Sequence, residues 1–210
     1  MIRRRLYRAA MPLAIALTMG TTGGTAQMAS GSEGTLQVDM RKLWEDHVSW
    51  TRMYIISATA NAPDKAATLD RLMKNQDDIG NAMKMFYGDS AGQKLTGLLK
   101  DHIRIAGELV DAAAKSDKPK VEDASKRWGQ NADQLAMFLA AANPANWKVD
   151  DLKTMLHHHL DLTTKEVTAH LGKDWKGSID AYDKVRDQAL EMADALSSGI
   201  MKQFPQKAAM

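Results

Sequence analysis

No cysteine occurs among the 210 residues. The chain therefore has no means of forming a disulfide, a thiolate metal site, a cysteine-linked lipid anchor or a c-type haem attachment. It also lacks the phosphate-binding loop of nucleotide enzymes, the glycine-rich dinucleotide turn and the Gly-x-Ser-x-Gly nucleophile turn. No motif in the sequence specifies a reaction, so we do not expect an enzyme on this basis.

Residues 1–26 have the composition of a secretory signal peptide. Four arginines stand in the first eight residues, the apolar run AAMPLAIALTMG follows, and small residues come next. This apolar run is shorter than the roughly 20 residues that a membrane-spanning helix needs. We expect cleavage near Ala26, a periplasmic or secreted mature chain, and no stable membrane anchor after cleavage.

The positive net charge belongs to this leader. The chain has 28 basic and 26 acidic side chains, and without the four arginines 24 basic side chains remain, a net charge of −2. Basic side chains interleaved with aromatic ones, the pattern typical of nucleic-acid binding, are not found in the rest of the chain. We therefore expect no nucleic-acid partner.

The remaining residues predict an all-α protein. Apolar side chains recur with the helical period of 3.6 residues, and the alternation typical of strands is absent. Short connections between long helices force neighbours to be antiparallel, so we predict a single up-down bundle over 37–204. Residues 27–36 are predicted to be a flexible lead and residues 205–210 a flexible tail. The predicted helices are 37–60, 63–86, 90–115, 119–142, 148–171 and 174–203.

Each predicted helix carries one polar side chain near the middle of its apolar face. The intervals between these residues are 29, 26, 29, 28 and 27 residues, which indicates three helical hairpins of one pattern, a possible repeat. In an up-down bundle such positions fall at one height. We therefore predict a polar layer across the core, in which the histidines are largely buried. The six residues are His47, Gln76, His102, Asn131, His159 and Arg186.

The polar layer has two chemical interpretations besides a structural one that fixes helix register. Three neutral imidazoles can bind a Zn, Cu, Ni or Fe ion, which makes His47, His102 and His159 candidate metal ligands. Asp46 and Asp101 each precede a histidine and could orient its ring. Arg186, in contrast, suits an anionic ligand such as a carboxylate, and the amides of Gln76 and Asn131 suit either ligand.

Other metal or cofactor sites have weaker signals. Glu166 and His170 lie one turn apart and form a second candidate metal pair, predicted on the outer half of their helix. A b-type haem held by a histidine and a methionine needs no cysteine and is a minor option. The leading interpretation is a binding protein for a metal ion or small anion. The alternatives are a structural or protein-interaction bundle and a metalloenzyme of unknown reaction.

Four segments carry a resemblance to a family of small exported bacterial proteins without an established activity. They are LWEDHVSWTRMYIISA, LDRLMKNQDDIGNAM, YGDSAGQKLTGLLKDHI and AYDKVRDQALEMADALSSGI, and the resemblance covers most of 40–203. It implies an all-helical fold and carries over no functional residue. Relatives often have a histidine where this chain has Arg186, which favours a metal site in the family. Some are automatically named glycosyltransferase or acetylglutamate kinase, but this sequence has none of the nucleotide-binding features that such names require.

Overall fold

The computed structural model describes the backbone of residues 26–208 and the side chains of residues 35–207. This part of the chain contains helices and no strand. The predicted signal peptide lies outside it, apart from Ala26. No helix in the described part is long and apolar enough to cross a membrane. The helices are α1 Ala26–Thr59, α2 Lys65–Tyr87, α3 Asp89–Ala114, α4 Lys118–Ala142, α5 Val149–Leu171, α6 Trp175–Gln203 and the short α7 Pro205–Ala208.

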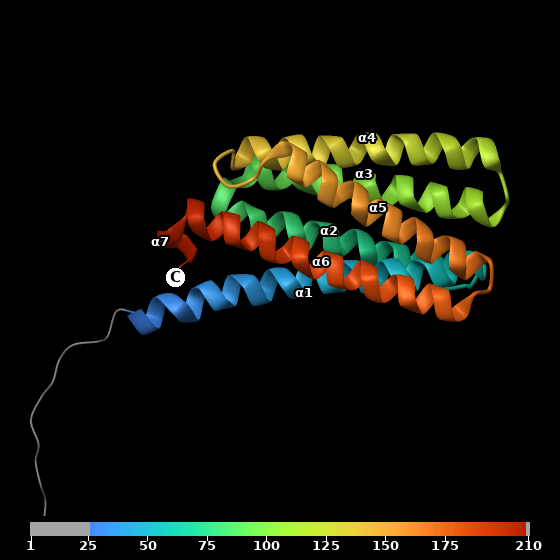
Figure 1. The fold of residues 1–210 in the computed structure, drawn as a ribbon, viewed down its shortest axis with the longest axis horizontal. Helices are drawn as coiled ribbons and strands as arrows, with labels where there is room; N and C mark the ends of the chain where they lie inside the picture. The colour runs from blue at the N-terminus through green and yellow to red at the C-terminus, as the bar shows by residue number, and fades with distance from the viewer. Residues whose placement is uncertain (1–25, 209–210) are drawn as a thin grey trace, which may run out of the picture.

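The six long helices run up and down along the long axis of the molecule (Figure 1). Each packs against the helix before it and the helix after it, and α6 returns to pack against α1, so the bundle is a closed ring. Weaker contacts join α1 to α3 and to α5. The predicted all-α, up-down bundle is confirmed.

Both ends of the bundle differ from the prediction. Helix α1 begins at Ala26, the last residue of the predicted signal peptide, and runs through the segment predicted as a flexible lead. Leu36 and Met40 already lie in the buried core. At the other end, the Lys207 ammonium donates hydrogen bonds to the carbonyl oxygens of Met85 and Phe86. Part of the predicted tail therefore forms α7 and lies on the bundle.

The three hairpins α1–α2, α3–α4 and α5–α6 share one loop geometry. Each loop contains one residue with positive φ, namely Asn61, Ser116 and Lys173. In each, the next residue donates its backbone N–H to the carbonyl five residues before it, at 2.8–2.9 Å, the pattern of a Schellman motif. These loops lie together at one end of the bundle (Figure 1). The equal loops support the predicted hairpin repeat.

The connection between hairpins brings α2 and α3 unusually close together. A Cβ atom added to Gly92 would lie 2.7 Å from the carbonyl oxygen of Gly80 and would also overlap the side chain of Lys84. Only glycine on both helices allows this approach. The crossing sets the position of the second hairpin against the first.

Candidate functional site

The three predicted layer histidines lie in the interior of the bundle. Only 3% of His47, 5% of His102 and 4% of His159 is exposed. The rings of His47 and His159 are 5.9 Å apart between centroids, with their planes tilted by 40°. Their burial follows from their positions on apolar helix faces and confirms that part of the prediction.

Each histidine contacts an amide side chain on the next helix, 29 residues later. The Nδ1–H of His102 donates to Asn131 Oδ1 at 2.7 Å, and the Nδ1–H of His159 donates to Gln188 Oε1 at 3.0 Å. At His47 the polarity is reversed, because Gln76 Nε2 donates to Nδ1 at 3.3 Å. Every hairpin therefore contains one histidine–amide pair.

The amide groups also tie each hairpin together through the backbone. In every hairpin an amide NH₂ donates to the carbonyl oxygen of the residue four positions before the histidine. The three bonds are Asn75 to Leu43 at 2.9 Å, Asn131 to Leu98 at 3.1 Å, and Gln188 to Met155 at 3.1 Å. In the first hairpin Asn75 binds the backbone carbonyl and Gln76 contacts the histidine ring. In the other two hairpins one amide side chain makes both contacts. The layer is thus the same structural unit used three times.

The second ring nitrogen of His102 is also engaged. The indole N–H of Trp128 donates to His102 Nε2 at 3.0 Å. Since Nδ1 of His102 carries the proton given to Asn131, both ring nitrogens are satisfied in the neutral form. The corresponding tryptophan beside His47, Trp44, packs edge-on at 5.6 Å, and its indole nitrogen has no hydrogen-bond partner.

Burial keeps the three imidazoles neutral. Removal from water, together with repulsion from neighbouring histidines, lowers the pKa of His47 and His102 to about 3. Burial also lowers the pKa of His159, against the opposing effect of its hydrogen bond to Gln188. Neutral imidazole is the form that binds a metal ion.

One residue predicted to belong to the layer lies outside it, and two aspartates predicted to orient its histidines do not contact them. Arg186 is 42% exposed in its side chain and pairs with Asp187, so its predicted place in the layer is wrong. Asp46 pairs with Arg71 at 3.1 Å, and Asp101 pairs with Arg104. Neither aspartate contacts a histidine ring, because a helix turns each of them about 100° away from the residue that follows.

Gln188 is the layer residue that the sequence analysis missed. The intervals from Gln76 to Asn131 and from His47 to His102 are both 55 residues, whereas His102 to His159 is 57. A position 55 residues after Asn131 is Arg186, which the sequence analysis chose. A position 29 residues after His159, the interval seen in the other two hairpins, is Gln188. The face of α6 was ambiguous because much of its buried surface is alanine, including Ala181, Ala189 and Ala193.

Glu166 does not lie on an outer surface as predicted. It is only 1% exposed and accepts a hydrogen bond from Arg52 at 2.7 Å. Burial raises the pKa of Glu166 to about 7, although the Arg52 guanidinium opposes this rise. His170 packs edge-on against Trp175 at 5.2 Å. A carboxylate already paired with arginine is a poor ligand for a second cation, which argues against a Glu166–His170 metal pair.

As the side chains stand, no group of three or more His, Asp or Glu residues in the described part of the chain could hold a metal ion. The hydrogen bond from Trp128 also occupies one ring nitrogen of His102. Two apolar cavities of about 20 Å³ lie within the core, and no layer histidine lines either of them. Each has room for about one water molecule. Neither can contain an organic carboxylate or a haem.

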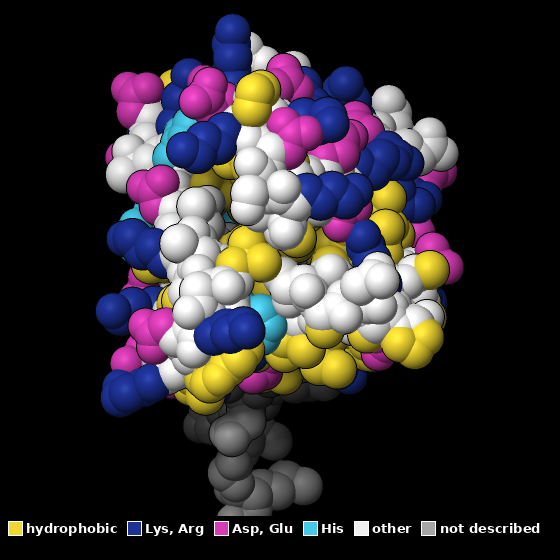
Figure 2. Space-filling view, turned by 90° about the vertical axis from the view of Figure 1, so that its right-hand side faces the viewer, with side chains coloured by type: hydrophobic (Ala, Val, Ile, Leu, Met, Phe, Trp, Pro, Cys, Tyr) yellow, Lys and Arg dark blue, Asp and Glu magenta, His cyan; other side chains and the backbone are white. Residues whose placement is uncertain are grey.

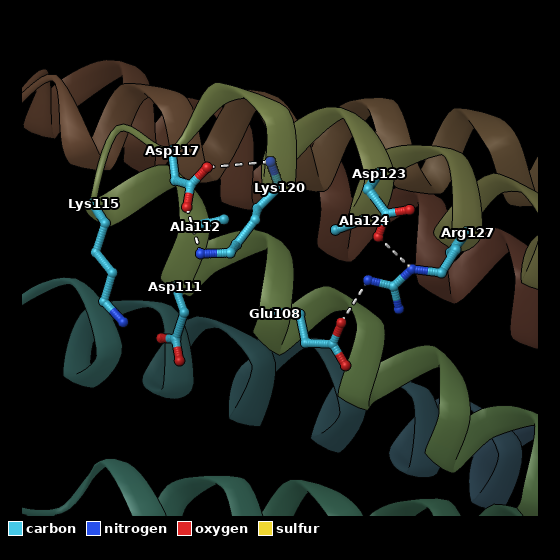
Figure 3. Close-up of a pocket in the computed structure, with 9 residues that line it drawn as sticks. All are labelled: Glu108, Asp111, Ala112, Lys115, Asp117, Lys120, Asp123, Ala124 and Arg127. Atoms are coloured by element: carbon cyan, nitrogen blue, oxygen red, sulfur yellow. Dashed lines mark hydrogen bonds and ion pairs between the residues drawn. The ribbon is translucent and has the colours of Figure 1, made fainter.

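A charged groove of about 410 Å³ lies between α3 and α4 (Figure 3). Arg127 bridges Glu108 and Asp123 across it, and Lys120 pairs with Asp117. Its charges therefore largely neutralise one another, and we find no converging set of ligand-binding groups there.

The end of the bundle that carries the hairpin loops has mixed charges around its rim and hydrophobic side chains between them (Figure 2).

No family model, no curated protein and no solved structure matches this chain. The resemblance to exported bacterial proteins therefore stays a prediction. The functional argument rests on the histidine–amide layer.

Proposed function

We propose that the chain is an exported binding protein that holds one transition-metal ion on the imidazoles of the polar layer. The observation that carries this proposal is the orientation of the rings. In His102 and His159 the Nδ1–H is bound to an amide oxygen, so the lone pair is on Nε2 of each ring, where in His102 it accepts the indole N–H of Trp128. Hydrogen bonding of one imidazole nitrogen while the other binds the ion is the usual arrangement in metal sites.

A small anion is a poorer candidate for the ligand. Arg186, the residue that would attract it, lies at the surface. The layer itself contains neutral imidazoles and amides, and the two apolar cavities in the core are too small for an organic acid. A surface pocket of about 370 Å³ reaches Asn131, but the carboxylates of Asp101 and Glu108 line it together with its arginines. A metal ion needs ligand atoms rather than a cavity of its own.

Within this proposal His159 is the first ligand, and His47 joins it only if the Gln76 amide turns away, because His47 Nδ1 accepts from Gln76 Nε2 and the neutral ring then carries its proton on Nε2. Their rings already lie 5.9 Å apart. His102 becomes a third ligand only for an ion that needs one, because it must first give up its hydrogen bond from Trp128. Replacing Trp128 with Phe removes that competitor and should strengthen any binding that uses His102.

A structural role for the layer is the second candidate function. It is favoured by the double hydrogen bonding of His102, since a ring with both nitrogens satisfied serves to fix the register of α3 against α4. Under this alternative the molecule is a structural or interaction bundle, and its partner surface lies elsewhere.

The two functions are separated by metal titration of a variant that keeps only the layer histidines. His157, His158 and His170 are replaced with Gln, since they are the other three of the six histidines and lie wholly or partly exposed. The chelator-treated protein is then titrated with Zn²⁺, Cu²⁺, Ni²⁺, Cu⁺ and Ag⁺ while the melting temperature is measured. An ion at 100 times its Kd should stabilise the fold by about 2.7 kcal/mol, or roughly 5 °C or more.

The stabilisation should disappear in His159→Leu and remain in the parent variant. If none of the five ions raises the melting temperature, the metal proposal is wrong. If in addition His102→Leu melts at or above the parent, the structural alternative is favoured, because hydrophobic replacement of buried polar groups is often neutral or stabilising.

A further inference from the structure

An apolar patch is exposed where α1 ends and α6 begins. Four of the eight large hydrophobic side chains that are exposed in the described part of the chain lie there, namely Met53, Ile56, Trp175 and Ile179. Trp175 is 56% exposed and Ile179 is 52% exposed. Figure 2 shows hydrophobic side chains along the lower edge of this end of the bundle, the side on which α1 and α6 lie. A group of exposed apolar side chains on a soluble protein indicates an interaction site, and we call these four residues the α1–α6 patch.

The two helices are held together beneath this patch. Arg52 Nη1 donates to the carbonyl oxygen and to the hydroxyl of Ser178, at 3.2 and 3.4 Å, and the guanidinium lies 4.9 Å from the centre of the Tyr182 ring. Because α1 and α6 are antiparallel, these contacts place Met53 and Ile56 level with the first turns of α6. The four side chains therefore belong to one surface built on a rigid pair of helices.

Trp175 has a fixed position within the patch. Its ring packs edge-on against His170 at 5.2 Å, and Asp174 caps the helix that begins with it by accepting the N–H of Gly177 at 2.9 Å. A side chain that is already ordered loses little conformational entropy on binding. Tryptophan is also among the residues that contribute most to protein–protein interfaces. The patch is therefore suited to another protein surface.

The charges beside the patch indicate which protein surface it fits. Lys176 lies three residues before Ile179 and Asp183 lies four residues after it, and both charged side chains are exposed. Seven residues apart, they lie on the same face of α6. If α6 of a second copy lies antiparallel across a twofold axis near Ile179, Lys176 of each copy faces Asp183 of the other, as an isologous interface requires. An anionic membrane would instead favour a surplus of basic groups, whereas this end of the bundle has charges of both signs (Figure 2).

We propose that two copies of this chain associate through the α1–α6 patch, with their α6 helices antiparallel and Lys176 of each copy paired with Asp183 of the other. Lys176 can exchange its present partner Asp180, because exposed pairs within one helix contribute little to stability. Four large side chains are few compared with the roughly 20–30 residues that each partner contributes to a standard interface. The dimer should therefore be weak and reversible, with a Kd on the order of 100 µM.

Sedimentation velocity measures this association at protein concentrations from about 5 µM to about 1 mM, on both sides of the expected Kd. A chelator is present throughout, so that a metal ion cannot link the copies. We expect a monomer at the lowest concentration and a dimer at the highest. A monomer at every concentration, or growth beyond the dimer, overturns the proposal.

A charge placed in the patch tests whether this surface is the interface. Ile179→Asp should weaken dimerisation by about 100-fold or more, because it buries a carboxylate at the twofold axis. Met137→Asp is the matched control, since Met137 is 50% exposed but lies on α4, and it should change the Kd by less than about threefold. Both positions are exposed, so the variants should fold, which far-UV circular dichroism verifies. Equal effects of the two substitutions overturn the assignment of the interface.

A charge exchange tests the antiparallel arrangement. Lys176→Asp and Asp183→Lys each place like charges opposite one another and should each weaken the dimer by about tenfold. The double variant restores opposite charges and should return the Kd to within about threefold of the wild type. A double variant no tighter than the single variants overturns the pairing of Lys176 with Asp183.

Vesicles containing equal parts of neutral and anionic phospholipid test the other occupant of such a patch. We expect no cosedimentation of the protein with them. Cosedimentation that Ile179→Asp abolishes, without a dimer in solution, overturns the proposal in favour of a lipid surface.

Discussion

The amide side chain of Gln188 orients the ring of His159. Gln188 accepts the Nδ1–H of His159 and donates to the carbonyl of Met155. Replacement by leucine should leave a buried N–H and a carbonyl without partners, at a cost of about 1–3 kcal/mol. Chemical denaturation of Gln188→Leu should measure this loss.

Arg186→Leu is the matched control, because it makes the same kind of change two residues earlier on α6. Arg186 is partly exposed and pairs only with its neighbour Asp187, so we expect a change within about 0.5 kcal/mol. A larger loss at Arg186 than at Gln188 would show that our assignment of the layer on α6 is incorrect.

The sequence was sufficient to predict which histidines are buried, because each stands where a helix face is otherwise apolar. The sequence was not sufficient to predict the burial of Glu166, whose side chain lies in the interior. A carboxylate can be buried there because Arg52 contacts it, and Arg52 is 114 residues earlier on another helix. Compensation between charges that are distant in sequence cannot be inferred from the pattern of one helix.

Among the elements, the crossing of α2 and α3 is sensitive to added volume. In Gly92→Ala the new methyl group would meet the backbone of Gly80, which cannot move aside as a flexible side chain can. The helices must separate, and we expect a loss of about 1–3 kcal/mol, measured by denaturant unfolding.

Gly97→Ala provides the control within the same helix. A Cβ at Gly97 meets nothing within 4 Å, and the residue is exposed. Alanine is the better helix former, so this variant should gain about 0.5–1 kcal/mol. Similar losses in both variants would mean that the close crossing does not explain the Gly92 result.

The helices themselves were predicted well because caps and breaks lie in the local sequence. Asp117 and Asp174 accept N–H groups of the first turns of α4 and α6. The early start of α1 was missed because its first turns include glycine and serine, which are poor helix formers. Its buried residues Leu36 and Met40 gain stability from contacts with the core, which the local sequence does not reveal.

For the whole molecule, the neutral histidines predict instability in acid. In the unfolded chain they bind protons below pH 6.5, whereas His47 and His102 in the fold do so only near pH 3. Their contribution to stability is therefore complete above pH 6.5 and lost as the pH falls. At pH 5 each of these two histidines lowers the free energy of unfolding by about 2 kcal/mol relative to its value above pH 6.5. His159, with a lowered pKa, acts in the same direction.

Glu166 opposes this trend. Its pKa is raised from 4.5 to about 7, so its ionisation destabilises the fold as the pH rises between these values. Acidification from pH 7 to 5 therefore raises the contribution of Glu166 to the free energy of unfolding by roughly 2 kcal/mol. The histidines prevail, and we expect a net loss of at least about 2 kcal/mol and a melting temperature lower by about 5 °C or more. The variant without His157, His158 and His170 should show the same loss of stability in acid. A constant melting temperature from pH 5 to 8 would contradict the prediction.

The closed ring has a consequence for how the chain folds. Nearly all extensive helix contacts join consecutive helices, and the packing of α1 against α6 is the extensive contact that connects the two ends of the described chain. Proteins dominated by such local contacts fold quickly. Each histidine–amide bond spans only 29 residues within one hairpin, so a hairpin can form its own pair before it meets the others. The contact between the His47 and His159 rings, in contrast, can form only when the third hairpin closes against the first.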